Sequence, residues 1–299
     1  MKFSATTNPP CPILSPASWR MGGKPRNHTT PGCTIHAQAS SRLDGKAPLY
    51  LFVLSLALLA HALTAQTPTA QSVLAGPRQA VNQADYRASG HLVRVDAAGK
   101  RTSYDISIKA HWFPGVLRIL LQVAAPAEAR ANILIEMRPD GQNSVHIAHP
   151  GDKALTALPF DKWTDGPLGP GFSYEDFFQD QYFWPVQAVT QSVRRGARDC
   201  DVLKSIPGPA DKTHYEQSLT WLDHTIDFPI YAEKTLKAGA GVKEFTSFGV
   251  RHDGGMWSAT QIEEKTRGQA GSTLLIINRG SPKAKLTLAD FSPERLLRF

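Results

Sequence analysis

The sequence predicts a mainly β protein with about eleven antiparallel strands and one helical interruption in the middle of the chain. Several segments alternate apolar and polar residues with a period of two, which indicates half-buried strands. Gly, Pro or Asp separates most of these segments, and the strand–helix–strand rhythm of a parallel sheet is missing. Such a sheet must cover its apolar face, so it closes into a barrel or curls over an interior that holds helices or a ligand.

The clearest alternation lies in residues 101–112, 116–123 and 131–137. The apolar residues that share one face of each segment, and that are candidates for lining an interior, are Ile106, Ile108, Trp112, Leu117, Ile119, Leu121, Ile133, Ile135 and Met137. Alternation shows which side chains share a face, but not which face is buried. Shorter or weaker strand patterns follow along the chain to residue 278.

Two helical segments are expected in this β-rich chain, besides a capped helix turn within residues 287–298. Residues 71–82 have an amphipathic pattern that Gly76-Pro77 would interrupt, because proline cannot donate a helical hydrogen bond. Residues 159–171 are rich in Pro and Gly and read as a loop. A helix is expected over residues 174–182, with Ser173 as its N-cap and Asp176 at the capping-box position.

The first 65 residues read as a leader, and residues 66–299 as a single domain. An apolar run over residues 49–63 follows Arg42 and Lys46, which is the pattern of a signal peptide. Cleavage is expected after Ala62 or Ala65, and an uncleaved membrane anchor is the alternative. Met21 is a second candidate start, in which case residues 1–20 are not translated.

Charge argues against a nucleic-acid partner. The chain has 33 Lys and Arg against 26 Asp and Glu, but residues 1–65 hold six of the basic residues and one of the acidic ones. The remaining 27 and 25 nearly cancel, and a nucleic-acid footprint needs basic residues clustered on the folded domain.

Signatures of catalysis and of metal binding are almost absent from the sequence. It contains no G-x-S-x-G, H-E-x-x-H, Walker or G-x-G-x-x-G motif, and we expect no metal and no cofactor. His224 lies between Asp223 and Asp227, and a carboxylate beside a histidine can poise it for acid–base work. A secreted hydrolase that uses this histidine is therefore one alternative.

Several stretches resemble one known family. Residues 118–126 (RILLQVAAP) and 130–135 (RANILI) resemble the R-x-L-L-x-F-x-x-P … G-T-x-F-L stretch of outer-membrane lipoprotein-sorting proteins, the LolA-like family related to the lipoprotein carriers LolA and LolB. Residues 169–177 (GPGFSYEDF) resemble that family's G-S-x-F-S-Y-E-D-L motif, and residues 215–229 are similar to a later stretch. The similarity covers residues 86–294.

The resemblance implies an unclosed antiparallel β-barrel with a helical lid over an apolar cavity. It implies non-covalent binding of an acyl chain, phospholipid or lipoprotein in the periplasm by a monomeric, non-catalytic protein. It also implies an inner-membrane donor complex or an outer-membrane acceptor as a partner. The motif residues of the lid would be Phe172, Tyr174, Glu175, Asp176 and Phe177. Arg118 would meet a lipid head group at the rim, or lie on the surface.

Three functions therefore remain open from the sequence. The first is a carrier of lipids or lipoproteins, and the second is the hydrolase. The third is a structural or interaction module of the cell envelope that uses the same fold without a ligand. A fully packed interior favours such a module, whereas a buried void lined by the alternating apolar residues favours a carrier.

Overall fold

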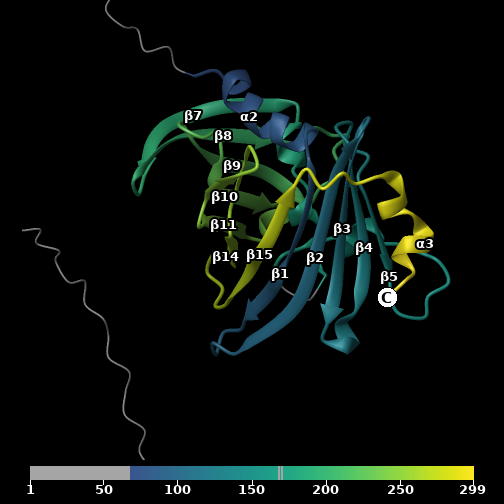
Figure 1. Ribbon diagram of the computed structural model, residues 1–299. Helices are drawn as coiled ribbons and strands as arrows, with labels where there is room; N and C mark the ends of the chain where they lie inside the picture. The colour runs from purple at the N-terminus through teal and green to yellow at the C-terminus, as the bar shows by residue number, and fades with distance from the viewer. Residues whose placement is uncertain (1–67, 168, 170) are drawn as a thin grey trace, which may run out of the picture. The chain divides into compact units, whose positions relative to one another are not determined.

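The computed structural model describes residues 68–167, 169 and 171–299 (Figure 1). The signal peptide, its cleavage sites and the leader boundary lie outside these residues. The α-helices are α2 (Ala70–Asn82) and α3 (Pro293–Leu296). The 3₁₀ helices are η1 (Ala127–Ala129), η2 (Phe160–Lys162), η3 (Tyr174–Phe177), η4 (Asp180–Tyr182), η5 (Lys237–Gly239) and η6 (Leu288–Phe291). No helix in this part of the chain is both long and apolar enough to span a bilayer.

Strands make up most of the regular structure. They are β1 (Asp85–Val95), β2 (Arg101–Phe113), β3 (Val116–Ala125), β4 (Ala131–Met137), β5 (Ser144–Ala148), β6 (Thr156–Ala157), β7 (Val186–Arg195), β8 (Arg198–Ile206), β9 (Tyr215–Asp223), β10 (Pro229–Leu236), β11 (Val242–Phe248), β12 (Arg251–Asp253), β13 (Met256–Ser258), β14 (Gln261–Thr266) and β15 (Ser272–Pro282). The sequence predicted about eleven strands, and the structure has fifteen among the described residues. One of the additional strands arises because residues 256–265, expected as one strand, divide into β13 and β14 where the β12–β13 hairpin leaves the main sheet.

Thirteen strands form one antiparallel sheet in the order β6-β5-β4-β3-β2-β1-β15-β14-β11-β10-β9-β8-β7. The end strands β6 and β7 do not pair, so the sheet curls without closing. Strands β1–β5 form one wall and β7–β11 the other, joined through β15 and β14 (Figure 1). The expected unclosed antiparallel barrel is confirmed.

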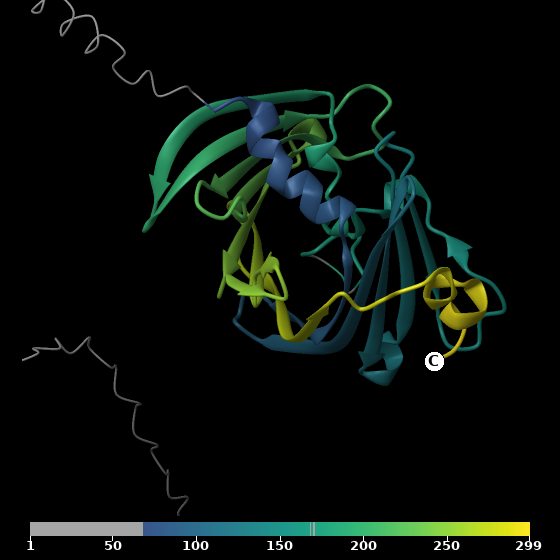
Figure 2. The same ribbon diagram turned by 45° about the horizontal axis from the view of Figure 1, so that its top comes forward.

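The concave face of the sheet holds the main hydrophobic core. Apolar side chains from β2, β3 and β4 pack in one cluster with α2 and with the aromatic residues of the mid-chain segment. Figure 2 shows α2 crossing over the space between the two walls. Because side chains alternate along each strand, the same strands turn their other side chains to the outer face.

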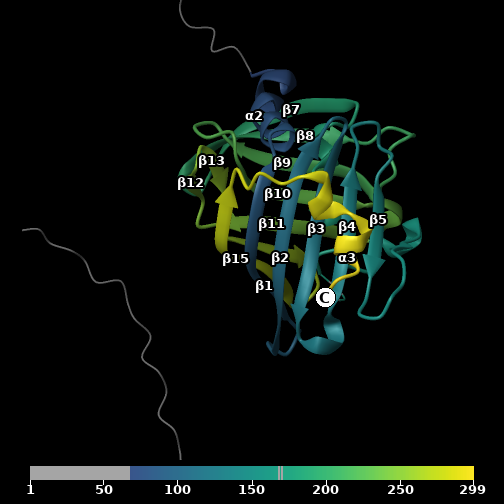
Figure 3. The same cartoon turned by 45° about the vertical axis from the view of Figure 1, so that its right-hand side comes forward.

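The outer face of β3 and β4 is covered by the C-terminal segment (Figure 3). Leu120 and Leu134 pack there against Phe291 and Leu296 in a second cluster. The side-chain amide of Asn132 donates a 2.6 Å hydrogen bond to the carbonyl of Leu296 and fixes α3 on the sheet. Strand β3 is therefore buried on both faces.

Two helical predictions need correction. The helix α2 continues through Gly76-Pro77, because Val73, Leu74, Pro77 and Val81 are all buried along one side, and this packing offsets the lost hydrogen bond. The helix expected over residues 174–182 is two short 3₁₀ helices, η3 and η4. Phe178 breaks it with an extended backbone at φ −71° and ψ 149°, which carries its ring into the core.

Candidate functional site

The first wall of the candidate site is the concave face of β2, β3 and β4. Eight of the nine apolar residues predicted to line an interior are at most 5% exposed: Ile106, Ile108, Leu117, Ile119, Leu121, Ile133, Ile135 and Met137. The ninth, Trp112, is half-buried and packs against the same cluster. The cross-strand pairs Ile119–Ile135 and Leu121–Ile133 place these side chains next to one another. The structure thus brings all nine residues to one apolar surface.

Arg118 lies on the other side of the sheet from this wall. Its Nε atom donates a 2.8 Å hydrogen bond to Oε1 of Glu136, and its guanidinium group lies over the ring of Phe113. Strand alternation sends it away from Leu117 and Ile119, so it faces outward rather than toward the mouth of the concave surface.

Residues from the middle of the chain pack against the concave face of this wall. We use the name lid segment for residues 158–184, within which residues 168 and 170 are not described. Its longest helix has only four residues, and its aromatic side chains Phe172, Tyr174 and Phe178 are at most 5% exposed. Gly171 approaches β15 so closely that a Cβ atom would lie 1.9 Å from Oγ1 of Thr273, and its φ of +120° also disfavours other residues. This chain therefore needs glycine at position 171, which the motif itself leaves open.

Asp176 is the centre of the lid's attachment to the second wall. Its Oδ2 atom accepts hydrogen bonds from the Ser173 amide at 2.7 Å and from the Ser173 hydroxyl at 2.9 Å, which completes the predicted capping box. The same oxygen lies 2.6 Å from Nζ of Lys243 on β11, and the hydroxyl of Tyr215 on β9 donates to Oδ1. Nζ of Lys243 also donates to the carbonyl of Gly171 at 2.7 Å.

The electrostatics of this cluster favour an ionised Asp176. Burial alone would raise the pKa of Asp176, but the charges of Lys243 and Lys234 and the hydrogen bonds from Lys243 and Tyr215 outweigh it. The net effect holds the pKa below its usual value. The pKa of Glu264 is instead above its usual value, because burial raises it more than the charge of Lys243 lowers it.

Glu175 attaches the lid at a second point. Its carboxylate accepts hydrogen bonds from the backbone amide of His214 at 2.9 Å and lies 3.0 Å from Nδ1 of the same residue. The imidazole ring stacks on Phe160 with ring centroids 3.9 Å apart. The two acidic residues of the F-S-Y-E-D motif are therefore buried anchors for the lid.

Further contacts hold the C-terminal part of the lid. Asp180 accepts a 3.2 Å hydrogen bond from the side chain of Asn143, and the carbonyl of Tyr182 accepts one at 2.7 Å from Nε of Arg78 on α2. Burial, together with repulsion from Glu175, raises the pKa of Asp180 to about 6. A buried carboxyl that titrates near neutrality was not anticipated from the sequence.

The lid is attached asymmetrically. Among the described residues, no hydrogen bond or ion pair joins residues 171–178 to β2, β3 or β4, whereas several join it to β9, β11 and the residues just before β9. Toward β2, β3 and β4, residues 171–178 contribute to the shared hydrophobic cluster. These residues can therefore separate from the three strands without breaking a hydrogen bond. Elsewhere the lid segment is hydrogen-bonded to the β4–β5 side, by Asn143 to Asp180 and by the Leu158 amide to the Val145 carbonyl at 2.8 Å.

Sequence reasoning missed the partners of the motif acids. Lys234, Lys243, His214 and Tyr215 are 39 to 67 residues from their partners or from the lid, and no local pattern links them. One signal was available. Lys234 and Lys243 are charged residues inside strand patterns, and both are under 10% exposed in the structure.

The histidine considered for acid–base chemistry has another partner. Nε2 of His224 lies 2.9 Å from Oδ1 of Asp201, while Asp223 pairs with Arg198. The hydroxyl of Ser192 also donates a hydrogen bond to Oδ1 of Asp201, at 2.5 Å. The serine hydroxyl is therefore bound to the carboxylate and not to the imidazole. That order differs from a nucleophile–histidine–carboxylate chain. In the part of the chain that the structure describes, no group of three or more metal-binding side chains is present.

Solved structures with the same fold support this architecture. One is a domain described as outer-membrane lipoprotein-sorting, from Vibrio parahaemolyticus, with 19% identity over 75% of this chain and 97% of that one and a TM-score of 0.68. A DUF1329 family protein from Desulfovibrio piger has 15% identity over 77% of this chain and 100% of that one, with a TM-score of 0.69. A LolA superfamily protein from Nitrosomonas europaea has 15% identity over the same shares and a TM-score of 0.59.

The expected LolA-like fold is confirmed by these similarities. No curated protein matches the chain. A family model described as "Uncharacterized protein" matches residues 120–298, which is more than half of the chain and includes the second half of the first wall, the lid and the second wall. The chain belongs to that family, and its fold is that of the LolA superfamily.

Proposed function

We propose that this protein is a non-catalytic periplasmic carrier that binds an acyl chain of a lipid or lipoprotein between its lid and its first wall. The signal-peptide pattern and the likeness in fold to a lipoprotein-sorting domain support the proposal. On this reading the mature protein begins after Ala62 or Ala65. It would take its ligand from an inner-membrane donor complex and deliver it to an outer-membrane acceptor.

The asymmetric attachment of the lid carries this proposal. In residues 171–178, the polar groups Asp176 and Glu175 are bound to the side of β9 and β11, and the apolar groups rest against β2, β3 and β4. An acyl chain that enters between these residues and the three strands exchanges one apolar contact for another and breaks no hydrogen bond there. Burial of each methylene group contributes about 0.8 kcal/mol, so a chain of ten gains about 8 kcal/mol before the cost of moving the lid.

Native mass spectrometry of residues 66–299, purified from a bacterial periplasm, tests the proposal directly. We expect a bound species with the mass of a phospholipid, fatty acid or acylated peptide. Displacement of a fluorescent fatty acid by added lipid would then measure its affinity. A clean ligand-free mass together with no binding of the fluorescent fatty acid would overturn the proposal.

Two neighbouring residues of β3 provide a matched pair of variants. Ile119 is 3% exposed on the concave face, and Leu120 is 1% exposed on the outer face beneath the C-terminal segment. We expect Ile119→Phe to weaken binding of the fluorescent fatty acid at least fivefold, because the larger ring occupies the ligand's space. Leu120→Phe should leave it within twofold, although both changes overpack the core by a similar cost of about 1–3 kcal/mol.

A second candidate is an envelope interaction module that binds no lipid. It is favoured by the tight burial of the concave residues, since Leu121, Ile133, Ile135 and Met137 are all 0% exposed beneath the protein's own side chains. Absence of fatty-acid binding by wild type and by both folded phenylalanine variants would support the module over the carrier.

A further inference from the structure

The β14-facing edge of β15 becomes free part-way along the strand. Strand β14 pairs with β15 from Thr273 to Ile276, and one more hydrogen bond of 2.8 Å joins the Ile277 amide to the Thr260 carbonyl. Strand β15 then continues to Pro282 with β1 as its only described partner. Residues 278–281 are all exposed. A strand with one unpaired edge presents amide and carbonyl groups that another strand can use.

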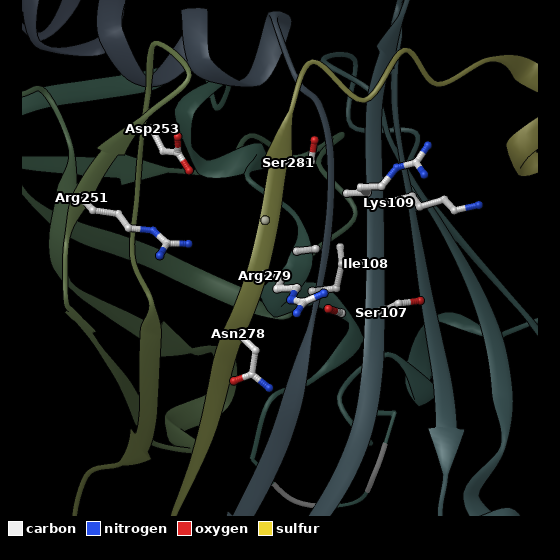
Figure 4. Close-up of a pocket in the computed structure, with 12 residues that line it drawn as sticks. Ser107, Ile108, Lys109, Arg251, Asp253, Asn278, Arg279 and Ser281 are labelled. Atoms are coloured by element: carbon white, nitrogen blue, oxygen red, sulfur yellow. The ribbon is translucent and has the colours of Figure 1, made fainter.

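The β12–β13 hairpin leaves the sheet beside this free edge, and its turn contacts the end of β15. At the hairpin turn, a Cβ atom on Gly254 would lie only 2.2 Å from Cγ of Pro282, so the turn packs against the last residue of β15. Between these two points lies a groove of about 610 Å³. Asn278 and Arg279 lie along β15 on one side of it, and Arg251 and Asp253 approach from the hairpin on the other (Figure 4).

The groove is strongly cationic. Arg87, Lys109, Arg251 and Arg279 line it, against the single acidic residue Asp253. Lys109 is neutralised by Asp290 at 3.3 Å, and Arg87 donates only to a backbone carbonyl at 3.4 Å. Within the described ranges, Arg251 and Arg279 have no ion-pair partner. These two guanidinium groups are therefore free to pair with carboxylates of another molecule.

This groove lies on the opposite face of the sheet from the candidate lipid site. Arg87 pairs across strands with Lys109 and Ser281, and alternation sends these side chains outward. The neighbouring Ile108 also lines the groove, but its side chain packs in the core, where it is 5% exposed. The charged side chains Arg87 and Lys109 therefore lie on the opposite face of the sheet from the apolar side chains of the first wall.

We propose that the groove between β15 and the β12–β13 hairpin binds an extended, acidic peptide segment of a partner protein. The segment adds a strand to the free edge of residues 278–281, and its carboxylates pair with Arg251 and Arg279. Strand addition draws its affinity from main-chain hydrogen bonds and its selectivity from alternate side chains. Because alternate residues share a face, acidic residues two positions apart lie on the same side as Arg279.

The free strand edge favours a peptide over an anionic lipid head group. A phosphate can pair with the arginines but cannot use a row of amide and carbonyl groups. The chain's own leader does not fit either, because residues 1–65 carry six basic residues and one acidic residue. About four residues of edge, at roughly 3.3 Å each, match a short peptide segment.

Fluorescence anisotropy of the full mature chain with a labelled peptide, TEVEVEVT, tests the proposal. We expect saturable binding that weakens at high salt. Arg279→Glu and Arg251→Glu should each weaken it at least tenfold. Arg101→Glu makes the same charge change at an exposed position near the other end of β2 and should stay within twofold. Two further peptides carry N-methyl groups, one on the odd-numbered and one on the even-numbered backbone nitrogens. At least one of these two registers of methylation should weaken binding at least tenfold.

Three results would overturn the proposal. One is peptide binding that Arg279→Glu leaves unchanged. Another is binding that neither N-methylated register weakens, which would show attraction by charge alone. The third is absence of peptide binding while vesicles containing phosphatidylglycerol bind wild type and not Arg279→Glu, which would assign the groove to lipid head groups. Fatty-acid binding under the lid should be the same in Arg279→Glu and wild type, so this test stands apart from the carrier proposal.

Discussion

The carboxylate of Asp176 and the ammonium group of Lys243 form an ion pair at 2.6 Å across 67 residues of sequence. The side chains are 0% and 10% exposed, so the pair lies within the protein rather than at its surface. It joins the lid to β11, the strand of the second wall that lies next to β14. Residues 171–178 of the lid are consequently held by charge on the side of β11 and by apolar packing on the side of β2, β3 and β4.

Loss of the cation should destabilise the whole domain. Lys243→Met leaves Asp176 buried and without its main counter-charge, and breaking a buried pair in this way typically costs about 3–5 kcal/mol. We expect a loss of that size in the free energy of unfolding, measured by urea denaturation. A loss below about 1 kcal/mol would contradict the anchoring role.

Two further variants separate this role from a general effect of charge. Lys265 pairs with Glu263 at 3.1 Å but is 52% exposed, so Lys265→Met should cost less than about 1 kcal/mol. Adding Asp176→Asn to Lys243→Met removes the uncompensated charge and keeps the oxygen that caps η3. The double variant should recover part of the lost stability.

Asp180 should make stability fall as pH rises. Its pKa of about 6 in the folded protein, raised mainly by burial, exceeds its usual value of 3.8. Between these values the folded state binds more protons than the unfolded state, so stability decreases as pH rises through this window and levels above it. In Asp180→Asn this contribution is absent.

Urea unfolding of both forms at pH 4, 5, 6 and 7 checks the Asp180 prediction. Relative to wild type, Asp180→Asn should gain about 2–3 kcal/mol between pH 4 and pH 7. Titration of Asp176 affects both forms and cancels in the difference. Parallel stability curves for the two proteins would show that Asp180 does not titrate in this range.

The first wall could be predicted because it depends on local alternation. Ile119 and Leu121 share a face with their cross-strand partners in any antiparallel pairing with the right register. The position of Arg118 could not be predicted in the same way. Strand β3 is buried on both faces, since Leu120 is 1% exposed beneath the C-terminal segment. Alternation alone does not distinguish the concave face from the outer face.

The lid was only partly predictable for a different reason. The Ser173–Asp176 capping box spans three residues and appears in the sequence as a local pattern. The ion pair of Asp176 with Lys243 depends on tertiary structure, as does the continuation of α2 through the buried Pro77. Long-range packing decides both features, and no single-sequence pattern records it.

Gly90 should be required where β1 approaches β15 most closely. A register shift occurs between Ser89 and Gly90, and a Cβ atom on Gly90 would lie 1.8 Å from the carbonyl oxygen of Ile276. We expect Gly90→Ala to lower the free energy of unfolding by about 1–3 kcal/mol, because the strands must separate. Gly280→Ala, in the paired strand, meets no atom within 4 Å and should change it by less than about 0.5 kcal/mol.

His224 provides the test of the hydrolase alternative. Its imidazole pairs with Asp201, which also accepts the Ser192 hydroxyl, so the histidine is not placed to activate that serine. We therefore expect His224→Ala to leave the rate of ester hydrolysis unchanged from wild type with p-nitrophenyl acetate and p-nitrophenyl butyrate across pH 6–8. Asp201→Asn is the companion variant, because it disturbs the same pair without removing the imidazole. A wild-type rate above the buffer reaction that falls at least tenfold in His224→Ala would replace the carrier with a hydrolase.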